Sequence, residues 1–219
     1  MMFRLSIAFA VLLAMAMADP VEKRQEEEDD QDQDQGDFQE TIIFLKRVTV
    51  DTEELFLRGG VGNRQDCQPD EAPEDDPCAI PISHIDLEMT SKIPNRNAYA
   101  NGDLFLTWGG NEPGQTSNAA GTPAQWTTND RRKPYYNALN VYGEHMWMVR
   151  VNMDCSVLQD GFFDFKGILN NQWEGTIASS NCNGNGAQTP PYTSENHIGR
   201  CGYINVFEWD SPSCTIESF

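Results

Sequence analysis

An alternation of apolar and polar residues with a period of two runs through most of the sequence and constrains its fold most. From Trp147 to Met153 every second residue is apolar, and Arg150 and Asn152 fall between them. Successive side chains of a strand point to opposite faces, so this segment is predicted to be a half-buried strand. Gly, Pro and Asn clusters separate the predicted strands, which are 41–50, 54–58, 80–89, 103–108, 145–154, 162–169, 173–178, 203–209 and 215–219. The pattern predicts an all-β chain with a single antiparallel β-sandwich or jelly-roll domain over 41–219.

The first 18 residues have the pattern of a secretory signal peptide. Arg4 precedes an apolar run of 13 residues, 5–17, which ends at the small-residue spacing of Ala16 and Ala18. A membrane-spanning helix needs about 20 residues, so we expect cleavage, a secreted extracellular protein and no membrane span. Residues 19–24 end in a dibasic pair, which fits either the removal of a propeptide or two solvated charges.

The six cysteines are even in number and follow a secretory signal, which favours three disulfides. The connectivity does not follow from the sequence, because six cysteines allow many pairings. We predict the pairs Cys67–Cys78, Cys155–Cys201 and Cys182–Cys214. No two cysteines have the short separation of a structural zinc knuckle, so zinc ligation by these thiols is not expected.

Residues 25–40 are predicted to form a disordered acidic tail. Nine acidic residues lie between Glu26 and Glu40, with glutamines between them and almost nothing apolar. Such a segment cannot bury enough surface to offset its ordering entropy.

An EF-hand is the first alternative to test in this tail, because Asp30, Asp32 and Asp34 alternate. The sequence does not fit the EF-hand loop. When Asp30 is taken as its first residue, Gln35 stands where the motif needs a glycine and Thr41 stands where it needs a glutamate. Two readings stay open: diffuse attraction of calcium by the three aspartates, or a solvated spacer.

The net charge of -19 limits the partners of the chain. Nucleic acids and anionic membranes are polyanions, so neither is expected to bind. A second acidic cluster lies between Cys67 and Cys78. This charge is compatible with calcium, mineral surfaces or basic proteins.

Aromatic residues beside turn-forming residues are the candidate binding residues. Sugar rings need flat apolar surfaces for their faces and planar polar groups for their hydroxyls. The tentative carbohydrate-binding set is Trp126, Tyr135, Tyr136, Trp173 and Tyr192, with Asn129 to bond hydroxyls. By contrast, Trp108, Trp147 and Trp209 lie in alternating strands and are expected in the core.

Catalysis is not expected, and no cofactor is implied. The three histidines, His84, His145 and His197, fall in no known catalytic motif. Four carboxylates are the glycosidase-type candidates, but no spacing selects a pair: Glu144, Asp154, Glu174 and Glu208.

Several short segments, in order and spacing, resemble the C-terminal accessory domain of secreted bacterial and invertebrate α-amylases. They lie at 55–60, 78–82, 103–108, 122, 126–129, 142–147, 153–155, 191–194, 196–197 and 201–205. The resemblance covers nearly all of residues 53–219. It implies a secreted β-sandwich associated with α-glucan enzymes and suited to glycan binding. Since the sequence holds no amylase barrel, the resemblance does not imply hydrolysis.

The sequence therefore predicts a secreted, non-catalytic carbohydrate-binding protein of α-glucan type. The alternative is an acidic extracellular or skeletal matrix protein that binds calcium or mineral through its Asp/Glu-rich segments. The expected partner is a polysaccharide in the first case. In the second case the acidic segments attract calcium or a mineral surface, and the β-domain binds a matrix polymer.

Overall fold

The computed structural model describes residues 38–85, 103–109 and 121–219. The predicted signal peptide, the propeptide and the aspartates at 30, 32 and 34 lie outside these residues. The regular secondary structure of the described part is all β-strand apart from one short 3₁₀ helix, η1 (Cys155–Val157). Among the described residues, no helix has the length and apolar character needed to cross a membrane.

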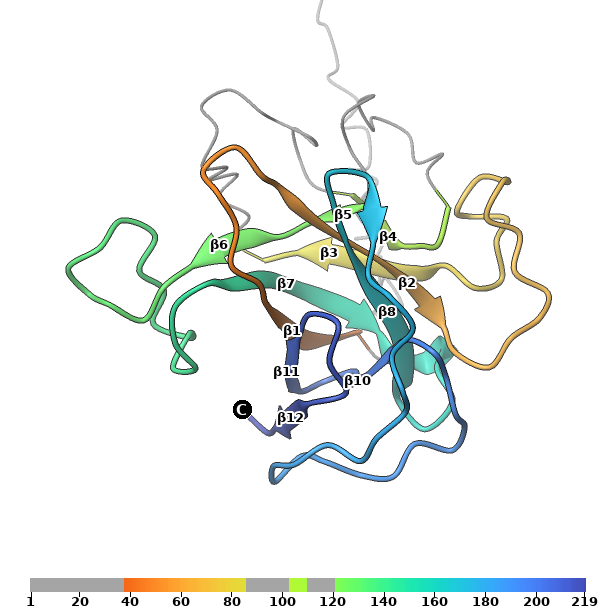
Figure 1. The fold of residues 1–219 in the computed structure, drawn as a ribbon. Helices are drawn as coiled ribbons and strands as arrows, with labels where there is room; N and C mark the ends of the chain where they lie inside the picture. The colour runs from red at the N-terminus through yellow and green to blue at the C-terminus, as the bar shows by residue number, and fades with distance from the viewer. Residues whose placement is uncertain (1–37, 86–102, 110–120) are drawn as a thin grey trace, which may run out of the picture. The chain divides into compact units, whose positions relative to one another are not determined.

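Figure 1 labels the strands in their order along the chain. Their bounds are β1 Phe38–Lys46, β2 Leu55–Val61, β3 Ile80–His84, β4 Phe105–Leu106, β5 Thr122–Pro123, β6 Gln125–Thr127, β7 Met146–Asp154, β8 Phe162–Leu169, β9 Gln172–Trp173, β10 His197–Arg200, β11 Ile204–Glu208 and β12 Cys214–Glu217.

The strands form two sheets. The larger has the order β12-β11-β1-β7-β3-β4, with β6 also paired to β7, and the smaller has the order β10-β8-β2-β5, with β9 paired to β8. The pairs are antiparallel except for β1 and β11, which run parallel with Ile42 opposite Ile204. Because about 160 residues separate these two strands in the sequence, no hairpin dictates their relative direction. The predicted all-β class is confirmed, with this parallel pair as the departure from a purely antiparallel sandwich.

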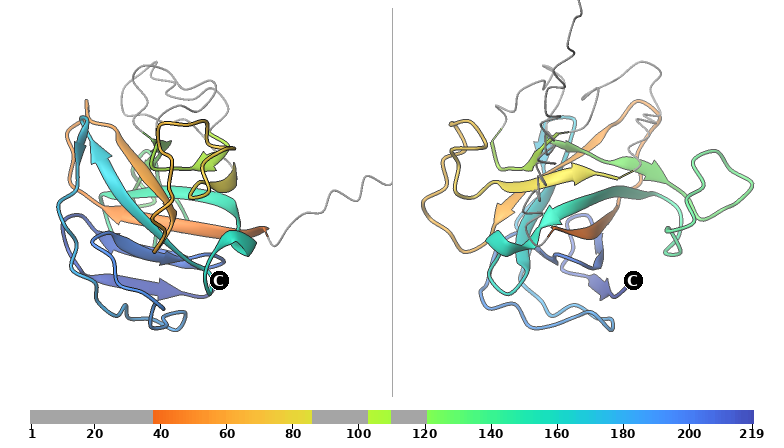
Figure 2. Two further views of the ribbon diagram at one scale, coloured as in Figure 1. Left: turned by 90° about the vertical axis from the view of Figure 1, so that its right-hand side faces the viewer. Right: turned by 180° about the vertical axis from the view of Figure 1, so that it is seen from behind.

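One main hydrophobic cluster takes residues from both sheets, which therefore pack against each other (Figure 2). Leu45 and Val149 come from the large sheet, and Leu57 and Phe165 come from the small one. A second, smaller cluster lies on the other face of the large sheet and includes Phe44. The N-terminal end of β7 is buried on both faces. It is therefore more buried than the half-buried strand that its alternation predicts.

The three predicted disulfides are all present, and the described residues contain no free cysteine. Cys67–Cys78 closes the short acidic loop. Cys155–Cys201 joins the segment after β7 to the end of β10, and therefore links the two sheets. Cys182–Cys214 fastens the long irregular segment 174–196 to β12.

Two boundaries differ from the predicted strands in ways that the side chains explain. β1 begins at Phe38, so the last three residues of the predicted tail are paired with β7, where the side chain of Glu40 also accepts a hydrogen bond from Arg150. The strand predicted over 173–178 ends at Trp173. The next side chain, Glu174, turns inward to bind backbone groups, and the chain leaves the sheet.

Candidate functional site

The loop between β6 and β7, residues 128–145, gathers four of the six predicted binding residues on or beside it. In Figure 1 this loop extends beyond the end of the large sheet as a green lobe. Asn129, Tyr135 and Tyr136 belong to the loop and are exposed, with 39 % of Tyr135 and 36 % of Tyr136 accessible. Trp126 lies at its base in β6.

The base of the loop is anchored to the outer face of the large sheet. Leu139 and Tyr142 pack against the smaller cluster that contains Phe44 and Met148. The rings of Tyr142 and Phe44 are 5.4 Å apart and tilted by 57°. Burial raises the pKa of the Tyr142 hydroxyl, and the charge of Glu217 adds to this effect. The loop thus covers apolar surface of β1 and β7.

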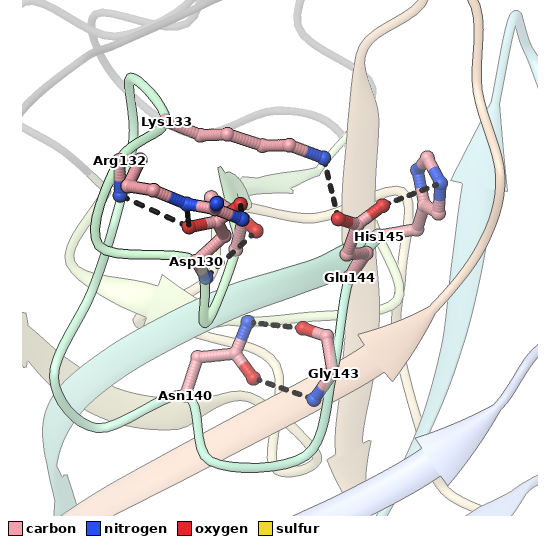
Figure 3. Close-up of polar contacts among 8 residues, drawn as sticks. Asp130, Arg132, Lys133, Asn140, Gly143, Glu144 and His145 are labelled. Carbon is pink, nitrogen blue, oxygen red and sulfur yellow. Dashed lines mark hydrogen bonds and ion pairs between the residues drawn. The ribbon is translucent and has the colours of Figure 1, made fainter.

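A buried amide fixes the path of the loop on its return to β7. Asn140 donates to the carbonyl of Gly143 at 2.8 Å, and its Oδ1 accepts from the N–H group of Gly143 (Figure 3). It also donates to the hydroxyl of Thr127 at 3.0 Å and accepts from the N–H group of Tyr142. These bonds use the donor and acceptor sides of the amide, as buried polar groups require.

The tip of the loop is closed by backbone hydrogen bonds. The amide of Thr128 donates to the carbonyl of Tyr135, and the amide of Asn137 donates back to Thr128, each at 3.1 Å. Between them, Asp130 begins a turn in which the amide of Lys133 donates to its carbonyl at 3.0 Å. The aromatic pair is therefore held on an ordered scaffold, which reduces the ordering entropy that a ligand has to offset.

Ion pairs hold the charged side chains of the tip (Figure 3). Arg132 donates to both carboxylate oxygens of Asp130, at 2.9 and 3.0 Å, and these bonds lower the pKa of Asp130 to about 2. Lys133 donates to Glu144 and lowers its pKa. His145 lies on the other side of Glu144, with 3.9 Å between Nε2 and Oε2.

Trp126 is a support and not a surface platform, so the expectation that it is exposed is wrong. Only 9 % of it is accessible, because it lies opposite the buried Trp147 in the β6–β7 pairing and packs into the main cluster. The rings of Tyr135 and His145 contact it edge-on, each with a centroid distance of 5.9 Å. Both of these residues have positive φ, an uncommon backbone conformation that turns their side chains toward Trp126.

Trp173 is in a different place from the loop residues. It follows a two-residue turn, Asn170 and Asn171, that has positive φ at both positions, and it is 48 % exposed. Its ring stacks on Trp108, with centroids 6.2 Å apart and planes at 29°. Trp108 is half-buried, as is Trp209, whereas Trp147 lies in the core as predicted.

Tyr192 is half-buried and belongs to a polar group around Asp164. Ser194 and Asn196 both donate to Oδ2 of Asp164. Burial raises the pKa of Asp164 despite these donors, and burial and the nearby carboxylate raise the pKa of Tyr192. The hydroxyl of Tyr192 also lies tight against Gly62. These contacts give Tyr192 a packing role in the fold.

The four glycosidase-type carboxylates each have a local partner. Asp154 caps η1, Glu208 pairs with Lys46, and Glu144 pairs with Lys133. Glu174 is buried against His197, 3.0 Å away. The cavity beside His197 is about 10 Å³, close to the space of a single water molecule.

Two further observations concern a buried histidine–aspartate pair and metal binding. His84 lies 2.5 Å from Asp103, which also accepts a hydrogen bond from Thr122, and this cluster is buried. The described residues contain no group of three or more His, Cys, Asp or Glu side chains placed to hold a metal ion.

The sequence analysis did not select the basic residues of the loop tip, Arg131, Arg132 and Lys133. Their position in the sequence could have indicated them, because three consecutive cationic residues in a strongly acidic chain directly precede Pro134 and the tyrosine pair.

Comparison of the chain with protein-family models, with curated proteins and with solved structures gives no match. The function therefore has to be argued from the side chains of the described residues.

Proposed function

We propose that the protein is secreted and binds polysaccharide without catalysis, through the exposed aromatic rings of the β6–β7 loop. The observation that supports this proposal is the exposure of Tyr135 and Tyr136 on a loop fixed by its own hydrogen bonds. Aromatic faces at the surface suit the apolar faces of sugar rings, and amide groups such as Asn129 suit their hydroxyls. Trp173, stacked on Trp108, supplies a further exposed ring.

The resemblance to the amylase accessory domain makes an α-glucan the first polysaccharide to test. The alternative hypothesis, an acidic extracellular matrix protein, makes calcium and mineral the competing ligands. The aspartates at 30, 32 and 34, on which the calcium hypothesis depends, lie outside the described residues. We put polysaccharide first because of the exposed aromatic rings of the loop.

The test measures depletion of the oxidised protein from solution by starch, chitin, alginate and calcium carbonate. We expect loss onto at least one polysaccharide. Tyr135→Ala and Tyr136→Ala should each weaken that binding about fivefold or more, because a stacked aromatic ring contributes about 1 kcal/mol or more. Phe219→Ala is the matched control, since Phe219 is an exposed aromatic outside the loop.

Two results would contradict the proposal. Depletion by calcium carbonate alone would favour the matrix role, and polysaccharide binding that is unchanged in both tyrosine variants would place the site elsewhere. Trp173→Ala then shows whether the second exposed ring is that site.

A further inference from the structure

A run of three cations distinguishes the tip of the β6–β7 loop from the rest of the chain. Arg131, Arg132 and Lys133 are three of the fifteen Lys and Arg residues in a protein of net charge -19. All three are exposed, and they directly precede the two exposed tyrosines in the sequence. Cationic groups and sugar-stacking rings are therefore presented by one short segment.

Arg131 is placed to bind an anion. Its guanidinium lies over the ring of Tyr136, 5.8 Å from the centroid, and its Nε donates to the tyrosine hydroxyl at 3.2 Å. Within the part of the chain that the structure describes, no carboxylate pairs with Arg131. The guanidinium fork matches sulfate and carboxylate groups in a bidentate geometry, and stacking on an aromatic ring orients it.

The two other cations are held by exposed ion pairs. The side chain of Arg132 is 88 % exposed while it contacts Asp130, and Lys133 is 47 % exposed beside Glu144. Exposed ion pairs are weak, so a ligand carboxylate or sulfate can replace the internal partner at small cost. Arg132 in particular already holds a carboxylate in the bidentate geometry that a ligand would adopt.

We infer that the β6–β7 loop selects an anionic polysaccharide, one with sulfate or carboxylate groups on its sugar rings. This inference rests on the proposed function and names the class of its ligand. A sugar ring lies against Tyr135 or Tyr136 while Arg131 binds the acidic group of the same or the next residue. This class differs from the neutral α-glucan that the sequence resemblance implies.

The negative charge of the whole chain does not cancel this local attraction. Charges more than about 8 Å away are largely screened at physiological ionic strength, so the ligand group responds mainly to the tip of the loop. The remote acidic residues instead oppose polyanions that would contact a wide area of the protein.

The experiment compares three polymers with one backbone, namely dextran, dextran sulfate and carboxymethyl dextran. Each is immobilised, and the affinity of the full oxidised protein is measured at physiological salt. We expect at least one charged polymer to bind about tenfold or more tightly than dextran, in keeping with a charge-assisted hydrogen bond. The sulfated and carboxymethylated arms show which anion is preferred.

Arg131→Gln should lower the affinity for the charged polymer about tenfold relative to the affinity for dextran. Arg131→Lys retains the charge without the fork and should give an intermediate loss. Arg64→Gln is the control, because Arg64 is also an exposed arginine but lies outside the loop, where it pairs with Asp66. Near-ultraviolet circular dichroism confirms that each variant is folded.

Different outcomes separate this inference from the proposed function. Equal binding of dextran and its charged derivatives, still sensitive to Tyr136→Ala, would overturn the anionic preference and leave polysaccharide binding intact. Equal loss in the Arg64 variant, or binding of polyglutamate as tightly as dextran sulfate, would show charge attraction without sugar recognition and would also overturn it. Binding to no polysaccharide would overturn both.

Discussion

Asp130 is the residue that organises the tip of the β6–β7 loop. Its Oδ1 accepts from the backbone amide of Arg132 as well as from the guanidinium, and its own amide donates to the hydroxyl of Thr128. One short side chain therefore sets the turn and orients a cation. The electrostatic consequence is a carboxyl group that stays ionised well into acidic solution.

We predict that Asp130 titrates with a pKa of about 2 in the folded protein, below its ordinary value of 3.8. Arg132→Gln should return the pKa toward the ordinary value, because the hydrogen bond from Arg132 is the main cause of the shift. Since the folded-state pKa is the lower one, the contribution of this pair to stability is complete above the unfolded pKa and disappears as the pH falls toward 2. Carbon-13 NMR titration of the carboxyl group measures both values.

The control for this titration is Arg64→Gln. The hydrogen bond from Arg64 lowers the pKa of Asp66, so this variant should raise the pKa of Asp66 and leave Asp130 unchanged. An ordinary pKa at Asp130 in the unaltered protein would show that the Asp130–Arg132 pair does not form in solution.

At the scale of the element, the β6–β7 loop behaves as a part of the fold and not as a loose connection. It covers the outer face of β1 and β7 with Leu139 and Tyr142, and a buried amide ties its two ends together. Loops of this length in compact domains are commonly functional, and an anchored base allows the tip to present its side chains in fixed positions.

Asn140→Ala should destabilise the protein by about 1–3 kcal/mol, because the buried hydroxyl of Thr127 and the half-buried carbonyl of Gly143 lose a hydrogen bond from its amide. Urea denaturation measures the loss in the free energy of unfolding. Hydrogen exchange should show faster exchange at the amides of Tyr142 and Gly143, which donate to the Asn140 side chain.

Asn129→Ala is the control for this variant. Asn129 is exposed on the same loop, so its removal should change the stability by less than about 0.5 kcal/mol. Equal costs for the two alanine variants would mean that the Asn140 network does not hold the loop.

At the scale of the whole molecule, the disulfides differ in what they connect. Cys155–Cys201 spans 46 residues and links the two sheets, whereas Cys67–Cys78 spans 11 residues and closes one loop. A cross-link restricts the unfolded chain more strongly when it closes a longer loop. The first bridge should therefore contribute more to the stability of the sandwich.

Replacing both cysteines of a bridge by alanine tests this order. We expect a loss of about 4 kcal/mol for the Cys155–Cys201 pair and about 3 kcal/mol for the Cys67–Cys78 pair, from the loop-length relation. Urea denaturation of the two double variants, with the other bridges oxidised, gives the comparison. A cost for the shorter loop that equals or exceeds that of the longer one would contradict it.

The sequence by itself determined the fold class, because alternation with a period of two is a local property that survives without knowledge of the partner strand. The long strands β7 and β8 were predicted to within one residue for this reason. The short strands β5, β6 and β10 were not predicted, because strands this short carry little periodic signal of their own. The disulfide pairs were also predicted, although the sequence left other pairings open.

The tertiary structure alone decided which aromatic residues reach the surface. Trp126 and Tyr135 had the same turn-rich context in the sequence, yet strand pairing with Trp147 buried the first and the turn at Asp130 left the second exposed. The stacking of Trp108 on Trp173 and of Arg131 on Tyr136 likewise depends on how the folded backbone directs each side chain. Exposure and contact depend on segments distant in the chain, and a local pattern does not contain that information.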